Sequence, residues 1–550
     1  MKKILYLLII LNTAVCILHG SDDFILDIIF TNDIHGGIDR ANATFMNPAF
    51  PPRLGGGASA ATYIKHIRSM AVANQRDNLL IDTGDFFQGR PVGTITEGVA
   101  VMEYMNMIKY DFIVPGNHEY DLGEGKLISL LSEAEFPVLS ANIFRKGTDE
   151  LVEYAQPYLI VQKMGLKIGI IGLTTTDTAL MSFDAHIKDV EFRSEIEILN
   201  RHIDTLRNKE GVDIIIVAMH AGVPFDPIPA YRERFENPNI PKRERVWGYD
   251  AQEIAHYVPG IDIILAGHVH VGLAKPWVDP TNHTLIFQNY AYLSGMSHII
   301  LKIDKKTKTI SGFDSPARNS VTFTLFEDQW IPDPDFDQVI SARVLEAEKG
   351  MDDFIGVAGV FLSRVSVDAQ NAMGNFVCEA MKETAGADFT FINLGGVRSD
   401  IPMGNVTYRN VFNAMPFDNM IVTLLVDGRF LKRIIETRVA GTRQGLILAG
   451  GKITYSRRRD DFDRVTRLEI GGEPWNPDKI YRVATTDFLL AGNAGLSLLT
   501  TLPENQIIRH EINLRDAMAD YFRNNSPVRV EIDDRWRRDD RSTPESYLQR

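Results

Sequence analysis

Short runs of β-branched and other apolar residues alternate with helical stretches over the first part of the chain. The runs end in polar or glycine-rich segments, as in NLLIDTGD, FIVPGNHE, KIGIIGLT, DIIIVAMH and IDIILAGH. Continuous apolar runs of this length are typical of strands that helices bury on both faces of a sheet. The pattern from Phe24 to about Phe326 therefore predicts an α/β domain, which we place at residues 22–330.

The pattern changes near residue 330. Prolines punctuate the segment IPDPDFD, and residues 338–349 are helix-forming, with apolar side chains on roughly one face. We interpret residues 331–354 as a linker and connecting helix. Strand-like runs at FTFINLGG, MIVTLLVDG and YRVATTDFLL, with helical patterns near 374–385 and 430–440, then predict an α+β domain at residues 355–533. Residues 534–550 are polar and mixed in charge, and we expect a frayed tail there.

The N-terminus has the pattern of an export signal. A basic start, Met1-Lys2-Lys3, precedes an apolar run over residues 4–18. This run is shorter than the roughly 20 residues needed to span a bilayer, and no comparable segment follows it. We therefore interpret residues 1–21 as a signal peptide and expect a periplasmic or secreted protein. An uncleaved N-terminal anchor is the alternative.

The charge balance limits the possible partners. The formal net charge is −14, whereas proteins that bind nucleic acid polymers rely on Lys and Arg to neutralise phosphates. A small anionic substrate would need a local positive centre, which bound divalent cations could supply. Nothing in the sequence indicates the oligomeric state.

Residues that can bind metal ions follow five of the predicted strands. They are Asp33, His35, Asp85, Asn117, His220, His268 and His270. Because the carboxyl ends of strands in an α/β sheet line one crevice, we expect these side chains to converge. An i, i+2 spacing on extended chain would point both members of each pair to the same face. With Asp85 as a bridge, two divalent ions could each take four ligands, and Zn, Mn, Fe or Co would suit them.

Several motifs together resemble those of a known family. TNDIHG, TGDFFQG, GNHEYD, AMHAG and GHVH are similar to the calcineurin-like metallophosphatase domain of the 5′-nucleotidase family. NLGGVRSDIPMGNVTYRNVFNAMPFDN and YRVATTDFLLAGNAG resemble its substrate-binding C-terminal domain. The resemblance implies an α/β metallophosphatase sandwich joined by a connecting helix to an α+β substrate domain. It also implies substrate contacts from Asn393 and Arg398, and stacking of Phe417 and Phe488 on the two faces of a base.

The catalytic hypothesis centres on the GNHEYD motif. His118 would stabilise developing charge or protonate the leaving group, and Asp121 would orient its imidazole. Two positions depart from the family pattern. Ala494 occupies the place of an Asp that in the family holds the ribose hydroxyls. The arginines that the family usually has just before the helix that begins near Gly374 are displaced, and this chain offers only Arg364, a little upstream.

These observations predict an exported dinuclear-metal phosphoesterase that hydrolyses nucleoside monophosphates to nucleoside and phosphate. Nucleoside di- and triphosphates and nucleotide sugars are further possible substrates. The nearest alternatives are a 2′,3′-cyclic nucleotide phosphodiesterase and a thiosulfate-ester hydrolase, since related enzymes reuse this metal site. A different class of protein would be an inactive surface protein that binds nucleotide or a partner, but such proteins usually lose metal residues that this chain retains.

Overall fold

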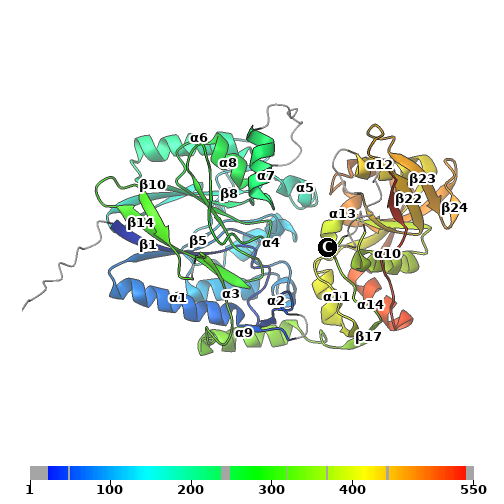
Figure 1. Ribbon diagram of the computed structural model, residues 1–550, viewed down its shortest axis with the longest axis horizontal. Coiled ribbons are helices and arrows are strands. Elements are labelled where there is room, and N and C mark those ends of the chain that lie inside the picture. The colour runs from blue at the N-terminus through cyan, green and yellow to red at the C-terminus, as the bar shows by residue number, and fades with distance from the viewer. Residues whose placement is uncertain are drawn as a thin grey trace, which may run out of the picture.

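The computed structural model describes residues 23–47, 50–236, 248–317, 319–366, 370–440 and 445–539. The predicted signal peptide and residues 540–550 of the predicted tail lie outside these ranges. An N-terminal and a C-terminal domain lie side by side, and one chain connection joins them (Figure 1). In the described ranges, every helix is too short or too polar to cross a membrane.

The N-terminal domain contains two large sheets. The first has the order β15-β14-β1-β4-β5, with β16 paired to β14, and the second has the order β12-β13-β11-β10-β8-β7. In the first sheet β1, β4 and β5 are parallel, and the antiparallel strands β14 and β15 extend it on one side. In the second sheet β13, β11, β10 and β8 are parallel, and the antiparallel strands β12 and β7 form its edges. The strands of the first sheet are β1 (Asp23–Thr31), β4 (Asp77–Asp82), β5 (Phe112–Ile113), β14 (Gly295–Asp304), β15 (Ile310–Asp314) and β16 (Thr322–Thr324). Those of the second are β7 (Tyr158–Lys163), β8 (Leu166–Thr174), β10 (Ile214–His220), β11 (Ile263–Ala266), β12 (Trp277–Val278) and β13 (Leu285–Gln288).

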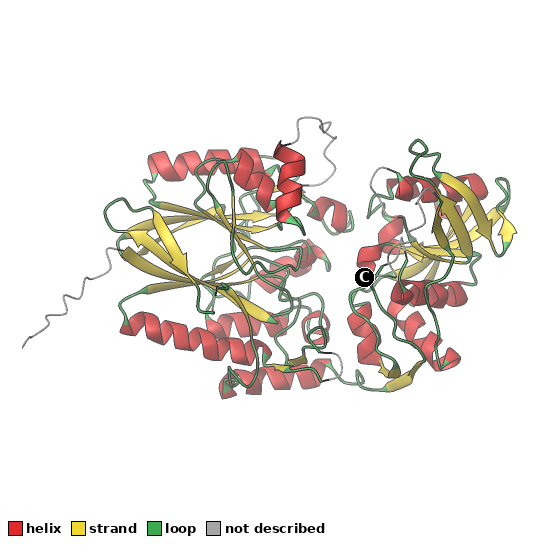
Figure 2. Ribbon diagram, in the orientation of Figure 1, coloured by secondary structure: helices red, strands yellow, loops and turns green. Residues whose placement is uncertain are grey.

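The two sheets pack face to face between helices, as Figure 2 shows. Ile28 and Leu79 of the first sheet share one buried core with Ile170 and Ile216 of the second. Separate apolar cores lie between each sheet and its helices, so the strands are buried on both faces. In chain order the helices of this domain are α1 (Gly56–Ala73), α2 (Pro91–Ile95), α3 (Val99–Ile108), α4 (Glu124–Leu131), α5 (Thr178–Met181), α6 (Glu195–Asp204), α7 (Pro227–Tyr231) and α8 (Ala251–Tyr257). The predicted sandwich is confirmed.

The connecting helix α9 (Pro334–Ala347) begins four residues before the predicted start. Asp333 caps it by accepting hydrogen bonds from the backbone N–H groups of Asp335 and Phe336. Proline is favoured at the first helical position, so Pro334 begins the helix rather than preceding it. Phe336 and Ile340 are buried in the core of the N-terminal domain, which fixes the helix to that domain.

The C-terminal domain is α+β, as predicted. Its main sheet has the order β21-β18-β25-β20-β26, and a second sheet has the order β24-β23-β22-β27. The strands of the second sheet are β22 (Gly451–Tyr455), β23 (Val465–Ile470), β24 (Glu473–Pro474) and β27 (Trp536–Arg538). Because β27 pairs with β22 and buries Trp536, this part of the predicted frayed tail is instead an ordered strand. Phe376 and Met518 contribute to the core beneath α10 and α14, and Phe391 and Leu431 to the core beneath α12. The main strands are β18 (Phe389–Ile392), β20 (Met420–Asp427), β21 (Ile447–Ala449), β25 (Ile480–Thr486) and β26 (Ile507–Asn513). The helices are α10 (Ala372–Ala385), α11 (Tyr408–Ala414), α12 (Gly428–Val439), α13 (Asp487–Leu490) and α14 (Leu514–Asn525).

Candidate metal centre and interdomain cleft

The structure brings six of the predicted metal ligands into two groups. In each group the potential ligand atoms lie within 4.8 Å of one another. The first group is Asp33, His35 and His270, and the second is Asp85, His220 and His268. The groups draw on both sheets, because β1 and β4 belong to one and β10 and β11 to the other. The crevice therefore lies where the carboxyl ends of two sheets meet, rather than along the edge of one.

In the first group, imidazole and carboxylate atoms converge closely. The Nε2 atoms of His35 and His270 are 2.9 Å apart, and His270 Nε2 is 3.4 Å from Asp33 Oδ1. His35 Nδ1 lies 2.5 Å from the carbonyl oxygen of Gln88, to which it donates. This hydrogen bond leaves the Nε2 lone pair of His35 pointing into the group, the arrangement usual for a histidine ligand.

The second group has the same design. His220 Nδ1 donates to the carbonyl oxygen of Thr83 at 2.7 Å, so its Nε2 faces Asp85 Oδ2 at 3.0 Å. His268 Nδ1 is 3.3 Å from His220 Nε2. Asp85 Oδ2 is also 3.9 Å from His35 Nε2 of the first group. Asp85 thus stands between the two groups, as a bridging carboxylate must.

Divalent cations fit this arrangement. Within the described ranges, Asp33 Oδ1 and Asn117 Oδ1 are buried and lack a hydrogen-bond partner. The lone pairs of His35 and His220 face other electron-rich atoms at 2.9–3.0 Å. Buried acceptors that face one another repel unless a proton or cation lies between them. The donor set of carboxylate, amide oxygen and imidazole indicates a dinuclear divalent metal site.

The backbone around these ligands differs from the extended chain that we expected. Left-handed φ angles occur at Asp33, His35, Asp85, His268 and His270. The expectation that each i, i+2 pair shares one group holds for the first pair only, because His268 and His270 belong to different groups. Tight turns after the strands, rather than strand pleating, aim these side chains.

Titration behaviour follows from burial and mutual charge. Burial alone would raise the pKa of Asp85, but His220 and His118 hold it well below its usual value. Burial and then the neighbouring His220 lower the pKa of His268 to about 4. Burial lowers the pKa of His220, but the neighbouring Asp85 outweighs this effect and raises the pKa to about 10. An ionised Asp85 and a neutral His268 are the forms that bind metal ions.

His118 lies beside the metal groups and is held by Asp121. Its Nδ1 is 2.6 Å from Asp121 Oδ2, and its ring centroid is 5.3 Å from that of His35. Burial lowers the pKa of His118, but Asp121 and Asp85 outweigh it and raise the value to about 9. The backbone N–H of His118 also donates to Asp85 Oδ1 at 2.8 Å. His118 can therefore carry a proton beside the metal centre.

Glu119 is a residue that the sequence reasoning missed. Its carboxylate accepts backbone hydrogen bonds from Asp85 (2.8 Å), Phe86 (2.9 Å) and Gly116 (2.6 Å). It thereby ties together the two loops that carry Asp85 and Asn117. Its place in GNHE was the available signal, but the hydrogen bonds to another loop depend on the fold.

The C-terminal domain brings two predicted substrate residues to this centre. Phe417 stacks on His118 with a centroid separation of 5.6 Å and an interplanar angle of 18°. The Arg398 guanidinium lies over Phe417 at 5.7 Å, and Arg398 has no carboxylate partner in the part of the chain that the structure describes. Both domains line one cleft of about 1860 Å³, which includes Arg398 and the candidate ligand His270.

The other predicted substrate residues have no direct contact with the metal groups among the described residues. Phe488 contacts Phe183 of the N-terminal domain edge-to-face at 6.1 Å. Arg364 lines the cleft but is paired with Asp400, its Nε 3.4 Å from the carboxylate. Asn393 precedes the short turn 394–396 after β18.

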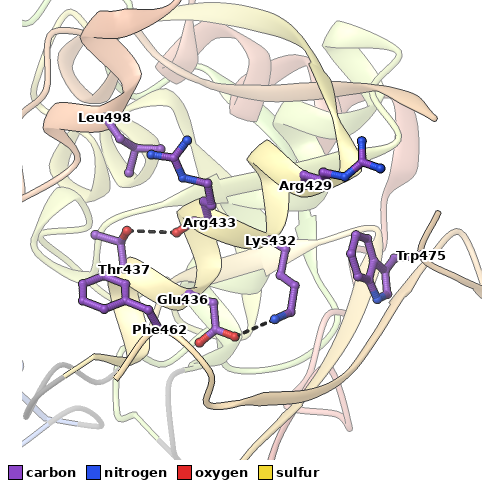
Figure 3. Close-up of a pocket in the computed structure, with 8 residues that line it drawn as sticks. All are labelled: Arg429, Lys432, Arg433, Glu436, Thr437, Phe462, Trp475 and Leu498. Carbon is purple, nitrogen blue, oxygen red and sulfur yellow. Dashed lines mark hydrogen bonds and ion pairs between the residues drawn. The ribbon is translucent and has the colours of Figure 1, made fainter. Parts of the chain in front are cut away.

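A second cavity, of about 390 Å³, lies within the C-terminal domain (Figure 3). Basic side chains of α12 and the ring of Trp475 line it, and Lys432 is paired with Glu436 at 2.9 Å. None of the predicted site residues lines it.

Comparisons with known proteins match both domains. Residues 26–272 match the family of calcineurin-like phosphoesterases, and residues 354–501 match the 5′-nucleotidase C-terminal domain. A snake venom 5′-nucleotidase of Naja atra is 28% identical over 86% of this chain and 92% of its own. A trifunctional nucleotide phosphoesterase protein of Bacillus subtilis is 27% identical over 86% of this chain, which spans only 32% of that protein.

A solved structure extends the match to the whole architecture. The 5′-nucleotidase precursor of Thermus thermophilus superposes with a TM-score of 0.79 over 94% of this chain and 100% of its own, at 23% identity. At this identity the likeness shows the shared fold. The domain matches add the metallophosphatase chemistry. The chain therefore combines a calcineurin-like phosphoesterase domain with a 5′-nucleotidase C-terminal domain, the architecture shared with the 5′-nucleotidases to which it is similar, and is a metal-dependent phosphoester hydrolase.

Proposed function

We propose that the protein is an exported 5′-nucleotidase that hydrolyses nucleoside monophosphates to nucleoside and phosphate. One observation carries the proposal: Phe417 of the C-terminal domain stacks on His118 beside the metal groups, and Arg398 lines the same interdomain cleft as the candidate ligand His270. A base, a phosphate and a hydrolytic centre can be accommodated there together. The names of relatives such as the venom 5′-nucleotidase support a nucleotide substrate.

The proposed metal ligands divide as the two groups do. Asp33, His35 and His270 would hold one cation, and Asp85, His220, His268 and Asn117 the other, with Asp85 shared. Bound divalent cations would lower the pKa of water and stabilise charge on the phosphoryl oxygens. The native metal among Zn, Mn, Fe and Co would follow availability, since all suit these ligands.

The chain's own residues would then handle the leaving group. Water's oxygen forms a bond to phosphorus, the ester P–O bond breaks, and the departing oxygen keeps the electron pair. His118 would give that oxygen a proton from Nε2, because Asp121 holds Nδ1 at 2.6 Å and leaves Nε2 free to face the cleft. Asp121 stabilises the protonated form and fixes the ring.

Substrate positioning falls to the C-terminal domain in this proposal. The Arg398 guanidinium, which has no carboxylate partner among the described residues, would bind a phosphate oxygen through charge-assisted hydrogen bonds. Phe417 and Phe488 would stack on the base, and Asn393 would contact the substrate from its loop. Arg364 could take part only after leaving Asp400, since the two are paired.

A phosphate-release screen tests the proposal. Purified protein would receive AMP, ADP, ATP, a nucleotide sugar and a 2′,3′-cyclic nucleotide, each with Mn²⁺ or Zn²⁺. We expect AMP to be hydrolysed, and Arg398→Ala to raise KM while Arg433→Ala, in the separate cavity, leaves kinetics unchanged. Hydrolysis of the cyclic nucleotide without AMP would favour the phosphodiesterase, and tight nucleotide binding without turnover would favour the inactive binding protein. Export is tested by fractionation and N-terminal sequencing of the recovered protein.

A further inference from the structure

One backbone turn is hydrogen-bonded to members of both candidate metal groups. It follows β4 and consists of Thr83, Gly84 and Asp85, and we call it the β4 turn. Its first carbonyl oxygen accepts from Nδ1 of His220 at 2.7 Å. Its second and third accept from the backbone N–H groups of Asp33 and His35, each at 2.9 Å. Asp33 and His35 belong to the first group and His220 to the second, so the β4 turn orients ligands of both.

The β4 turn is also connected to two further members of the groups. Asp85, its last residue, belongs to the second group itself. Oδ2 of Asp33 accepts a hydrogen bond from the backbone N–H of His268 at 2.8 Å, which joins that histidine to the turn through Asp33. A displacement of the β4 turn would therefore move ligands of both groups together.

The conformation of the β4 turn is unusual and depends on its surroundings. The φ angles of Gly84 and Asp85 are +97° and +58°, both in the left-handed region. A Cβ at Gly84 would lie 2.6 Å from the backbone nitrogen of Gly116 and 2.8 Å from Nδ1 of His220. Non-glycine residues such as Asp85 keep such a conformation where neighbouring contacts impose it.

Asp82 supplies one of these contacts from the end of β4. Its side chain is fully buried, and its Oδ1 accepts the backbone N–H of Gly84 at 2.9 Å. Its Oδ2 accepts the hydroxyl of Thr31, the paired residue on β1, at 2.7 Å. The Tyr110 hydroxyl lies 2.9 Å from Thr31 Oγ1 and donates to it, because the Thr31 hydrogen goes to Asp82. Asp82 thus joins the β4 turn to buried side chains of the first sheet.

We propose that Asp82 is a positioning residue for both metal groups and acts through the β4 turn. Its carboxylate belongs to neither group of ligand atoms, and both of its oxygens accept hydrogen bonds from Gly84 and Thr31. By fixing the N–H of Gly84, Asp82 sets the direction of the carbonyl oxygens that hold ligands of the two groups. The inference rests on the ligand assignment of the proposed function, but it is independent of which phosphate ester is the substrate.

The expected effect of losing Asp82 is a joint weakening of both metal ions. Asp82→Ala leaves the N–H of Gly84 and the hydroxyl of Thr31 without their acceptor in a buried place. Residues that orient metal ligands typically contribute about 10- to 100-fold to metal affinity, so we expect a loss of this size for each ion. Asp82→Asn should keep most of the affinity, because its amide oxygen can accept from Gly84 and its amide N–H can donate to Thr31.

Zinc titration of metal-stripped protein measures this effect without any substrate. Zn²⁺ would be added to the full chain in competition with a chromophoric chelator, and the affinity of each equivalent would be determined. Asp279→Ala is the matched control, since Asp279 is fully buried and its Oδ2 accepts the backbone N–H groups of Thr281 and Asn282 at 2.9 and 2.6 Å. Asp279 precedes β13, at the opposite end of the parallel strands from the metal groups. We expect the control to keep the Zn²⁺ affinity of wild type.

The outcomes separate positioning from general damage to the fold. Folded Asp82→Ala with wild-type affinity, a loss confined to one equivalent, or an equal loss in Asp279→Ala would overturn the inference. So would an Asp82→Asn variant as weak as Asp82→Ala. If circular dichroism shows that Asp82→Ala is unfolded, Thr31→Val should weaken both ions and Thr31→Ser should not, and unchanged binding in Thr31→Val would then overturn it.

The same titration keeps this inference distinct from the proposed function. Protein that binds two equivalents of Zn²⁺ but releases no phosphate from AMP would refute the nucleotidase proposal and leave the role of Asp82 standing. Wild-type protein that binds no Zn²⁺ would refute the ligand assignment and the inference with it.

Discussion

Phe417 offers a quantitative test of nucleobase recognition. Its ring now contacts His118 and lies beneath the Arg398 guanidinium. A base that stacks on Phe417 must replace one of these contacts. Phe417→Ala removes both the stacking surface and the contact with His118.

The expected loss follows from those two contributions. Stacking of a base on an aromatic side chain is worth about 1–3 kcal/mol. An aromatic pair such as His118 and Phe417 is worth about 0.5–1.5 kcal/mol, which the base must displace. With the midpoints of these ranges, about 2 and 1 kcal/mol, the net loss in Phe417→Ala is about 1 kcal/mol, or roughly fivefold in kcat/KM for AMP, and at most about 2.5 kcal/mol.

Steady-state kinetics with two substrates separates base recognition from damage to the metal centre. Ribose 5-phosphate carries the phosphate and sugar but no base, so its kcat/KM should change less than that of AMP. Phe417→Tyr should keep most of the AMP activity, and Phe462→Ala, an exposed phenylalanine of the separate cavity, should match wild type. Equal losses for AMP and ribose 5-phosphate would show that Phe417 acts through His118 and would refute base stacking.

Three further substitutions test other parts of the site. Asp85→Ala should abolish turnover and release about one or two equivalents of metal, because a bridging carboxylate serves both ions; retained metal and activity would exclude the bridging role. His118→Ala should keep the metal but lower kcat by roughly 10²–10⁴, and metal lost in step with activity would make His118 a ligand. Ala494 cannot accept ribose hydroxyl hydrogen bonds, so AMP and its 2′-deoxy analogue should differ by less than about tenfold in kcat/KM. Ala494→Asp should widen that gap, since the left-handed backbone there tolerates Asp, whereas a hundredfold preference in wild type would show that another residue holds the ribose.

The sequence predicted the chemistry better than the geometry of the site. Asp33 and His220 are recognisable because each ends an apolar strand, and the fold does bring such positions together. It could not show that two sheets contribute, because strand pairing joins residues far apart in the chain. The left-handed turn at Asp85 was likewise hidden, since non-glycine residues rarely adopt it and tertiary contacts impose it.

The remaining differences between the predicted and the observed structure depend on whether the sequence carries a local signal for them. The start of α9 was readable in principle, because Asp333 followed by Pro334 is a helix start, although the prolines suggested a break. The stacking of Phe417 on His118, by contrast, depends on how the two domains meet.

Metal-dependent release of phosphate from AMP tests the central claim most directly. Protein stripped of metal by a chelator would be titrated with Mn²⁺ or Zn²⁺, and AMP turnover would be followed at each addition. The two ligand groups predict no turnover without metal and a rise that saturates near two equivalents per chain. Full turnover after metal removal, or no phosphate release from AMP by folded protein that holds two equivalents, would contradict the account.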